Sequence, residues 1–341
     1  MSEGAERVLV VVNFAAARAR RAWPGIRRML AERGVGFDAC EPAAAGEMEL
    51  SVRAALREGY GTIAVVGGDG TLGEAARGFF ESADELAKDD DDALPASIAP
   101  RAALAILPAG TGNDFARGLT QKRAPLEMWL ERLVAHCRPD GDGPEETTRP
   151  VDVLYATVDG GARRFVCLNA ATLGIGADVA SRVAAQGSAL RRLSGEARFA
   201  LAATGALIAW RNRAVRIEVD EDYLLECATN LVAVANGPFA GGGMHFAPEA
   251  ASDDGRLEVV TACGVSRAGV VRELARIHRS GHLANPKVRL KSGTRARIQT
   301  IDEADPLRVE ADGDVRGHTP ATFRIMPRAL RIVRAPDDRL Q

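Results

Sequence analysis

Short runs of apolar, β-branched residues alternate with amphipathic stretches over the first 140 residues of the chain. The continuous apolar runs at Val8–Val12, Thr62–Val66 and Ala102–Leu107 are typical of strands that are buried on both faces. Hydrophobic residues recur at helical spacing between them. The other elements that we expect here are a strand at Val35–Cys40 and helices at Arg20–Glu32, Glu47–Arg57, Gly73–Phe80 and Pro125–Cys137. Repeated strand–helix units predict a parallel sheet with helices on both faces.

The pattern changes after Arg138–Pro150, a segment rich in Pro, Gly and charge that we interpret as a linker. The apolar runs then become shorter, and the turn at Gly160–Gly161 predicts a β-hairpin between Val151–Val158 and Arg164–Ala170. One helical stretch, Ser188–Trp210, interrupts the strands. The remaining strands are expected at Ala214–Val219, Tyr223–Cys227, Leu231–Ala235, Leu257–Thr261, Lys287–Leu290, Ala296–Ile301 and Thr322–Ile325. The second half is therefore predicted to be mostly β and to form a sandwich with a helical insertion.

Composition limits the function without identifying it. The 341 residues are 46% hydrophobic and 26% charged, which excludes a disordered chain. The net charge is −2, so binding of nucleic acid through bulk positive charge is not expected. No apolar run reaches the roughly 20 residues that cross a bilayer, and the chain start lacks the pattern of a secretory signal. We therefore expect a soluble, cytoplasmic protein.

The sequence gives little evidence for a metal site formed by cysteines or histidines, or for disulfide bonds. The five cysteines stand far apart without a CxxC pair, so neither a zinc site nor a disulfide framework is expected. His278 and His282 have helical i, i+4 spacing but no third ligand nearby, which favours a surface pair. The acidic run Asp89–Asp92 lies in an insertion, Ser82–Pro100, that we interpret as a solvated loop.

Two glycine-rich segments directly follow two of the expected strands. Gly67–Glu74 has the sequence GGDGTLGE and Leu107–Arg117 has LPAGTGNDFAR, and each opens a helix. Ligands of parallel sheets bind at the carboxyl ends of the strands, where glycines and a helix N-terminus suit a phosphate. Asp69 would repel a bare phosphate, so a divalent cation is expected to bridge them. The alternatives are a tight strand-to-helix turn for the first segment and an N-capped turn for the second. Neither segment contains a lysine or the P-loop pattern.

Together these segments resemble the motifs of the diacylglycerol kinase catalytic domain family, which includes soluble bacterial lipid kinases and is related to sphingosine and ceramide kinases. The first motif also occurs in NAD kinases and, as GGDGS, in phosphofructokinases, whereas PAGTGNDFAR is specific to the lipid kinases. The resemblance continues over nearly the full chain, through NAATLGIGADV (169–179), NGPFAGGGMHFAP (236–248), SDDGRLEVV (252–260) and Asp-Gly-Asp (312–314).

The resemblance implies a fold of class α/β plus β. A Rossmann-like nucleotide-binding domain, of the phosphofructokinase and NAD kinase type, would span residues 1–140. A mostly β, sandwich-like lipid-binding domain would follow over residues 148–325, with a helical insertion at 176–210. In the family the active site lies in the cleft between the domains. The chain end returns to the first domain there, so residues 326–341, which include RALRIVR, are expected to join it.

The resemblance also implies where ATP and Mg2+ bind, with Asp69 facing the Mg2+ that accompanies the phosphates. Glu74 would support the first glycine segment, and an ordinary helix N-terminal carboxylate is an equally fair interpretation. The family's first strand ends in an Asn-Pro-x-x-Gly phosphate loop, of which the segment Asn13–Ala17 keeps only the Asn. Arg18, Arg20 or Arg21 would have to compensate, although a solvated helix face suits most of them. The implied ATP-binding set is Asn13, Gly67, Gly68, Asp69, Gly70, Thr71, Leu72, Gly73, Glu74, Thr111, Gly112, Asn113 and Asp114.

Bacterial members of the family hold a second, structural Mg2+ through one aspartate side chain and two backbone carbonyls. The matching positions are Asp254, with the carbonyls of Ala251 and Arg256. An Asp-Gly turn before the next strand is the alternative interpretation of this segment.

In related enzymes the glutamate of an Asp-Gly-Glu sequence is the general base that takes the proton of the lipid hydroxyl. This chain has Asp314 there, one methylene shorter. A reach shorter by about 1.5 Å can cost about 100-fold in rate unless the backbone shifts. Asp312 is the nearby alternative carboxylate. The catalytic set that the resemblance implies is Asp314, Asp312 and Asp69.

The sequence thus predicts an ATP- and Mg2+-dependent lipid kinase that phosphorylates diacylglycerol or a related lipid such as a ceramide, a sphingoid base or phosphatidylglycerol. A NAD kinase-like phosphotransferase and a nucleotide- or lipid-binding relative without turnover stay open as alternatives. The altered loop after Asn13 and the shortened Asp314 motivate the second. The acceptor lipid is not encoded in any motif, because generic apolar walls hold lipid tails.

A membrane lipid as substrate requires peripheral contact with the inner face of the membrane. The segment Ser188–Arg216 is the candidate surface, because Arg191, Arg192, Arg198, Arg211, Arg213 and Arg216 stand among apolar residues. A core-packing helix with arginines on its wet face is the alternative. Nucleic acid is not expected as a partner, and a homodimer is left open.

Overall fold

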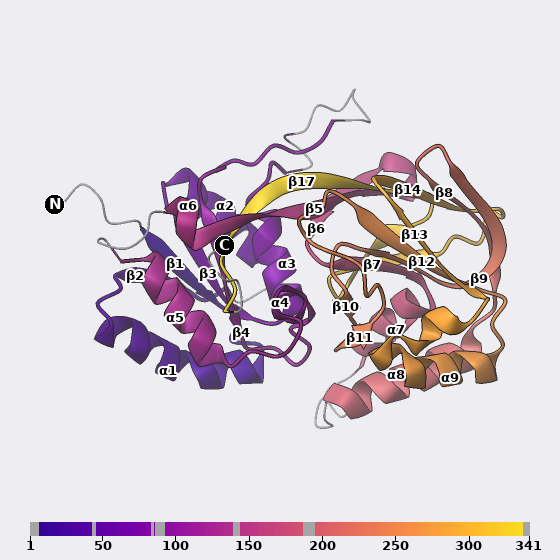
Figure 1. Ribbon diagram of the computed structural model, residues 1–341, viewed down its shortest axis with the longest axis horizontal. Coiled ribbons are helices and arrows are strands. Elements are labelled where there is room, and N and C mark those ends of the chain that lie inside the picture. The colour runs from indigo at the N-terminus through magenta and orange to yellow at the C-terminus, as the bar shows by residue number, and fades with distance from the viewer. Residues whose placement is uncertain are drawn as a thin grey trace. The chain divides into compact units, whose positions relative to one another are not determined.

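The computed structural model describes residues 7–336, except 43–45, 83–84, 86–92, 139–143 and 187–194 (Figure 1). The acidic run Asp89–Asp92 therefore lies outside the described residues. The chain forms two compact units. Unit 1 consists of Met1–Val153, Ser252–Asp254 and Met326–Gln341, and unit 2 consists of Leu154–Ala251 and Gly255–Ile325.

Unit 1 is built on a parallel sheet with the strand order β17-β4-β3-β1-β2. Strands β1 and β3 are buried along their whole length, as their continuous apolar sequences predict. Helices α1 and α5 pack together, and α2 packs against α3 on the other face (Figure 1). The elements are β1 (Val8–Val12), α1 (Ala17–Glu32), β2 (Phe37–Cys40), α2 (Glu47–Arg57), β3 (Thr62–Gly67), α3 (Asp69–Arg77), β4 (Ala103–Pro108), α4 (Asp114–Thr120), α5 (Leu126–His136) and α6 (Pro144–Thr147).

The end of the chain completes this sheet. Strand β17 (Ala321–Val333) is far longer than the expected Thr322–Ile325, and its second half pairs in parallel with β4 through Arg331 and Ile332. The backbone of Arg328 has a φ of 54° within the strand, and its N–H donates to the buried carboxylate of Asp152, 2.7 Å away. The alternation of apolar and polar residues breaks at this point, which explains why the pattern predicts only the first half.

Unit 2 is antiparallel, with the strand order β16-β15-β7-β9-β8-β14-β17 and with β12 between β9 and β13. Strands β5 and β6 form the predicted hairpin. Helices α7 and α8 pack on each other through Val179, Ala202 and Ala206. The elements are β5 (Thr148–Val158), β6 (Arg163–Cys167), β7 (Ala170–Gly174), α7 (Ile175–Ala184), α8 (Gly195–Ala209), β8 (Arg213–Val219), β9 (Tyr223–Ala235), β10 (Phe239–Ala240), β11 (Met244–His245), β12 (Leu257–Cys263), α9 (Arg267–Arg276), β13 (Val288–Gly293), β14 (Arg295–Thr300), β15 (Arg308–Ala311) and β16 (Asp314–His318). The predicted fold class, a parallel α/β part followed by a β-rich part, is confirmed.

Several local predictions differ from the structure, and two of them involve polar groups that are buried. The two strands expected at 223–227 and 231–235 are one strand, β9, because the polar Thr229 and Asn230 between them are buried and donate to the carbonyls of Ala262 and Val265. Likewise His282 is buried and not on the surface, and its Nε2 lies 3.0 Å from the carbonyl oxygen of Phe246. The expected linker 138–150 contains α6 and the start of β5 in its described part.

The cysteine prediction is also wrong for one pair. Cys227 of β9 and Cys263 of β12 form a disulfide, with their Cα atoms 5.9 Å apart. They are 36 residues apart in sequence, and only the antiparallel pairing of β9 with β12 brings them together. Spacing along the chain therefore carried no signal for this bond. Cys40, Cys137 and Cys167 form no disulfide.

A buried histidine couples the stability of unit 1 to pH. The Nε2 of His136 lies 3.0 Å from Thr62 Oγ1 and its Nδ1 lies 2.7 Å from Thr147 Oγ1, and desolvation lowers its pKa to about 4. The unfolded chain binds a proton near pH 6.5, so the stability that neutral His136 contributes is complete above that pH and is lost as pH falls towards 4.

We expect the unfolding free energy to fall by about 2 kcal/mol between pH 7 and 4.5 through this residue. Urea unfolding of wild type and His136→Gln at both pH values measures it. The Gln variant should lose correspondingly less stability on acidification. Equal losses in the two proteins would contradict the assignment.

Candidate functional site

The two glycine-rich segments lie side by side at the carboxyl ends of β3 and β4. These strands pair in parallel up to Gly67 and Pro108, and the Ala109 N–H donates to the Gly67 carbonyl, 2.8 Å away. A Cβ added to Gly110 would lie 2.4 Å from the Cα of Gly68, and one added to Gly68 would lie 3.1 Å from the Cα of Gly110. The two backbones therefore lie in contact, so a side chain at Gly110 would require the backbone to shift, and one at Gly68 would be tight.

The first segment is more helical than its glycines predict. Helix α3 begins at Asp69, one turn before the expected Gly73, so Gly70, Thr71 and Leu72 lie inside the helix. Because glycine disfavours a helix interior, the sequence predicted that this helix begins at Gly73 and not at Asp69. An aspartate in the first turn favours the helix, since it faces the positive end of the dipole. The Oδ1 of Asp69 accepts a hydrogen bond of 3.1 Å from the backbone N–H of Phe115 and so joins α3 to α4.

Asn13 organises the loop that follows β1. Its Oδ1 accepts hydrogen bonds from the N–H groups of Ala15 and Ala16, and its Nδ2 donates to Thr71 Oγ1, 2.8 Å away. The retained asparagine thus shapes the loop without the family's Pro and Gly and ties it to α3. Of the three arginines considered for compensation, Arg18 reaches the second glycine segment, where it donates to the Gly110 carbonyl over 3.2 Å.

A hydrogen bond between two of its own residues closes the second glycine segment. Asn113, at a φ of 52°, accepts a hydrogen bond of 2.9 Å from the Gly110 N–H, and Arg123 donates to the carbonyls of Thr111 and Gly112. Thr111 is exposed, whereas Asp114 is buried. Among the residues expected to bind ATP, Gly67, Thr71, Leu72, Gly73 and Asp114 are buried, and Gly70 and Thr111 are exposed.

A small pocket opens beside the two segments. Gly67, Gly68, Asp69, Pro108 and Asn113 line it together with apolar side chains of β3, α3, β4 and α4. Asp69 supplies the only carboxylate among the residues that line this pocket. Mg2+ is commonly held by one or two carboxylates plus substrate phosphates, and Asp69 offers one such carboxylate here. The residues present therefore fit a nucleotide phosphate with Mg2+.

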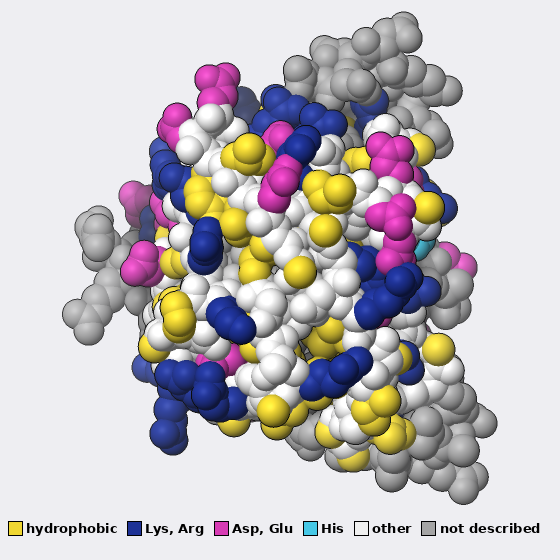
Figure 2. All heavy atoms as spheres, turned by 90° about the vertical axis from the view of Figure 1, so that its right-hand side faces the viewer, with side chains coloured by type: hydrophobic (Ala, Val, Ile, Leu, Met, Phe, Trp, Pro, Cys, Tyr) yellow, Lys and Arg dark blue, Asp and Glu magenta, His cyan; other side chains and the backbone are white. Residues whose placement is uncertain are grey.

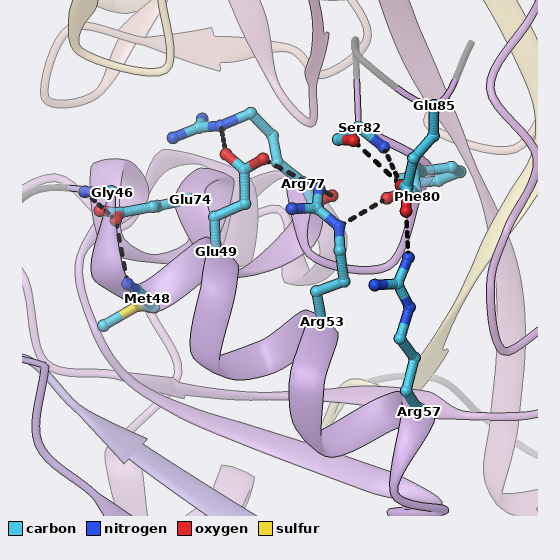
Figure 3. Close-up of polar contacts among 10 residues, drawn as sticks. All are labelled: Gly46, Met48, Glu49, Arg53, Arg57, Glu74, Arg77, Phe80, Ser82 and Glu85. Carbon is cyan, nitrogen blue, oxygen red and sulfur yellow. Dashed lines mark hydrogen bonds and ion pairs between the residues drawn. The ribbon is translucent and has the colours of Figure 1, made fainter.

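Glu74 does not hold the glycine segment. Its Oε1 accepts hydrogen bonds from the backbone N–H groups of Gly46 and Met48, over 2.6 and 3.3 Å, at the N-terminus of α2 (Figure 3). The same figure shows Glu49 of α2 between the guanidinium groups of Arg53 and Arg77. Both contacts fix α3 on α2, and so they fix the helix that begins at Asp69.

The close approach of the glycine segments gives a testable expectation. Gly110→Ala should lower the free energy of unfolding by about 1–3 kcal/mol, because a backbone rather than a flexible side chain blocks the new methyl group. Urea unfolding measures the change. Gly25→Ala in α1 is the matched control, since nothing lies within 4 Å of its Cβ position, and it should be neutral or stabilising. A Gly110→Ala protein as stable as wild type would contradict the described contact.

The catalytic carboxylates that the resemblance implies in unit 2 lie on the β15–β16 turn. Asp312 is buried, and its two oxygens accept hydrogen bonds from the N–H groups of Leu168 and Asn169, over 2.8 and 3.0 Å. It therefore pins the connection between β6 and β7. Asp314 has a side chain that is 60% exposed and pairs with Arg316 over 3.0 Å.

Sequence reasoning missed a third carboxylate beside this turn. Glu310 accepts hydrogen bonds from Thr172 Oγ1 (2.5 Å) and from the Gly313 N–H (2.6 Å). Burial raises its pKa to about 7, and the charges of Asp312 and Asp314 add to this effect. A glutamate between two apolar residues of a strand, directly before an Asp-Gly turn, was the available signal.

The segment expected to hold a structural Mg2+ precedes β12. Arg149 pairs with Asp253 over 3.2 Å, and the Asp152 N–H donates to the Ser252 carbonyl. Among the described residues, no group of three or more His, Cys, Asp or Glu side chains is placed to hold a metal ion. The expected set has one carboxylate and two carbonyls, so the site at Asp254 stays a prediction.

Comparisons with known proteins agree over both units. A family model described as "Diacylglycerol kinase catalytic domain" matches residues 7–140, and one described as "YegS C-terminal NAD kinase beta sandwich-like domain" matches residues 171–334. The "Probable lipid kinase YegS-like" of Xanthomonas campestris pv. campestris (strain 8004) is 30% identical over 313 residues, which cover 89% of this chain and 88% of that protein.

Two further relatives bear the name diacylglycerol kinase. That of Mycobacterium tuberculosis (strain CDC 1551 / Oshkosh) is 29% identical over 283 residues, 82% of this chain and 79% of the relative. The crystal structure of a diacylglycerol kinase from Bacillus anthracis str. Sterne superposes with a TM-score of 0.65 at 19% identity, over 98% of this chain and 99% of that one. The structural likeness shows a shared fold.

Proposed function

Since this chain belongs to the family of lipid kinases built on the diacylglycerol kinase catalytic domain, we propose that it transfers the γ-phosphoryl group of ATP, bound with Mg2+, to a hydroxyl of diacylglycerol. The observation that carries the proposal is the contact between Gly68 and Gly110 beside a pocket whose only carboxylate is Asp69. The family model that matches residues 171–334 is described as having an NAD kinase-like β-sandwich, which concerns the fold of that part.

The residues of unit 1 have separable tasks in this proposal. The glycine segments would receive the phosphates, because both follow the carboxyl ends of parallel strands, where such sheets bind ligands. Asn13 holds Thr71 and its own loop in place. Asp69 would hold the Mg2+, which supplies charge neutralisation at the transferred phosphoryl group when bound. Phosphoryl transfer depends on positioning and electrostatic stabilisation, so these contacts account for most of the expected rate.

The experiment that tests the proposal is a transfer assay with labelled ATP. The purified chain is incubated with [γ-32P]ATP, Mg2+ and mixed micelles of diacylglycerol, ceramide, sphingosine or phosphatidylglycerol, and the lipids are separated by chromatography. Label in diacylglycerol that requires Mg2+ supports the proposal. Label in another lipid would correct the acceptor. Label in inorganic phosphate alone would refute lipid kinase activity.

A second proposal concerns contact with the membrane that holds the substrate, through α8 and α9. No helix in the described part of the chain is long and apolar enough to span a membrane. Ile208 and Leu201 of α8 and Val271 of α9 are 71%, 51% and 54% exposed. Arg267 of α9 joins the two helices by donating to the carbonyls of Leu207, Ile208 and Trp210. Figure 2 shows hydrophobic side chains beside Lys or Arg side chains along the lower edge of the face that it draws.

The arginines differ from those that the sequence suggested. Arg213 and Arg216 lie on β8 and pair with Asp305 and Glu226, and Trp210 is buried. Arg191 and Arg192 lie outside the described residues. Arg211, also suggested by the sequence, is 72% exposed and pairs with Asp305. Helix α9 adds Arg272 and Arg276, which are 66% and 40% exposed and pair with Glu273.

Cosedimentation with phosphatidylglycerol vesicles tests this surface. Ile208→Asp should weaken binding by about tenfold, because it replaces an exposed apolar side chain that would enter the membrane surface with a charge that anionic headgroups repel. Leu224→Asp on β9 is the matched control, since Leu224 is 64% exposed outside the two helices. Equal binding by wild type and Ile208→Asp would refute the proposed surface.

A further inference from the structure

Arg123 connects the end of α4 to the residues that precede this helix. It follows the helix after Gln121, whose φ of 58° turns the chain. From there its side chain returns to the second glycine segment. Its Nη2 lies 2.7 Å from the carbonyl oxygen of Thr111 and 3.4 Å from that of Gly112. Arg123 itself lies outside both glycine segments, so neither motif includes it.

Side chains bind three successive carbonyl groups of the second glycine segment. Arg18 of α1 donates to the carbonyl of Gly110 over 3.2 Å, and Arg123 donates to those of Thr111 and Gly112. The N–H groups of Thr111 and Gly112, in contrast, donate to no other residue that the structure describes. Thr111 is exposed and Gly112 is half-buried. The carbonyls of this segment are therefore satisfied within the protein, whereas two of its N–H groups are left for a ligand.

The two arginines also set the direction of these N–H groups. The peptide bonds of the segment are trans, and the C=O and N–H of a trans peptide unit point in opposite directions. Arg18 holds the C=O of the unit that contains the Thr111 N–H, and Arg123 holds the C=O of the unit that contains the Gly112 N–H. Both N–H groups thus point away from the guanidinium that holds their own peptide unit. Successive backbone N–H groups of this kind bind anions such as phosphates.

The contact that Arg123 makes suits arginine better than lysine. A guanidinium presents several N–H donors in a rigid plane, so it can hold neighbouring carbonyls in one geometry, whereas an ammonium on a flexible stem fixes direction less well. Arg123 is exposed, and it forms no ion pair with a carboxylate in the described part of the chain. The side chain is therefore committed to the glycine segment.

We propose that Arg123 is a positioning residue for the nucleotide. By binding the carbonyls of Thr111 and Gly112, it keeps the N–H groups of the second glycine segment directed towards the phosphates of ATP. This inference rests on the proposed lipid kinase function, in which that segment receives the phosphates. Arg123 acts through the backbone and needs no contact with the nucleotide. It holds the segment in the bound conformation before ATP arrives, which lowers the cost of ordering the segment on binding.

Steady-state kinetics of Arg123→Ala test this role. We expect the KM for ATP to rise about tenfold, while kcat and the KM for the lipid stay within about threefold, because N–H groups that bind the phosphates before and during transfer contribute uniform binding. Arg123→Lys keeps the charge and one donor, so its KM for ATP should rise only about threefold. Arg101→Ala is the matched control, since Arg101 is exposed before the opposite end of β4, and it should keep wild-type kinetics. Thermal unfolding checks that each variant is folded.

NMR of the amide groups separates positioning from stability. In the 15N-labelled wild type, the amide signals of Thr111 and Gly112 should shift on addition of MgADP. In folded Arg123→Ala the same shifts should require about tenfold more MgADP. An Arg123→Ala protein with the ATP KM of the wild type, or wild-type signals of these two amides that do not respond to bound MgADP, would overturn the proposal. A wild type that binds no MgADP and labels no lipid would instead overturn the proposed function itself.

Discussion

Asp69→Asn is expected to reduce phosphoryl transfer to lipid by about 100- to 1,000-fold with little change in stability, since it removes charge from the site and leaves the local contacts in place. Asn keeps an Oδ1 that can accept the hydrogen bond that the Phe115 N–H donates to Asp69. The lost charge is the one expected to hold Mg2+ in the pocket. Initial rates with [γ-32P]ATP over a Mg2+ titration measure the effect.

The Mg2+ titration makes this test specific. A weakened Mg2+ site should show partial recovery of rate at high Mg2+, whereas a damaged fold should not. Glu41→Gln, at an exposed acidic residue just beyond β2, is the control and should behave as wild type. Transfer by Asp69→Asn within threefold of the wild-type rate at all Mg2+ concentrations would show that Asp69 has no such role.

The strands of unit 1 could be predicted from sequence because their uninterrupted apolar residues indicate strands that are buried on both faces. Val8–Val12 and Thr62–Val66 are apolar throughout, and in the structure they are buried throughout. The glycine segments could be placed at the carboxyl ends of two such strands by the same logic. Their contact through Gly68 and Gly110 could not, because the approach of two backbones depends on the tertiary structure.

The parts that sequence reasoning missed depend on partners that are distant in the chain. Glu74 has its hydrogen-bond donors 26 and 28 residues away, at the start of α2. Glu310 meets Thr172 across 138 residues, through the pairing of β15 with β7. A motif describes residue types at a fixed spacing along the chain. These partners of Glu74 and Glu310 lie too far away in sequence to belong to the same motif. Strand pairing supplies the missing information in both the Glu310 site and the Cys227–Cys263 disulfide.

The second large effect is expected from Glu49, which neutralises two buried arginines. Its Oε1 lies 2.9 Å from Arg53 Nη2 and its Oε2 lies 3.0 Å from Arg77 Nε, and these arginine side chains are only 8% and 9% exposed. Glu49→Ala leaves both guanidinium groups charged and buried. Arg53 keeps the carbonyls of Phe80 and Arg77 as acceptors, but no carboxylate replaces Glu49 in these two contacts.

Breaking a buried ion pair from one side typically costs 3–5 kcal/mol, and the 28% exposure of the Glu49 side chain places the expected loss near the lower end, at about 3 kcal/mol. Urea unfolding measures it. Arg57→Ala is the matched control on the same helix, because its ion pair with Glu85 is exposed and should contribute less than about 1 kcal/mol. Equal losses in the two variants would contradict the role of Glu49.

The position of α3 links this stability to catalysis. Glu49 holds Arg77 at the end of α3, and Asp69 begins that helix. Glu49→Ala should therefore raise the KM for ATP under conditions in which the protein is still folded, whereas Arg57→Ala should not. Glu49→Gln keeps an acceptor but loses the charge, so its KM and stability should lie between those of wild type and Glu49→Ala. That order would show that the buried charges on α2 and α3 keep Asp69 in place for the nucleotide.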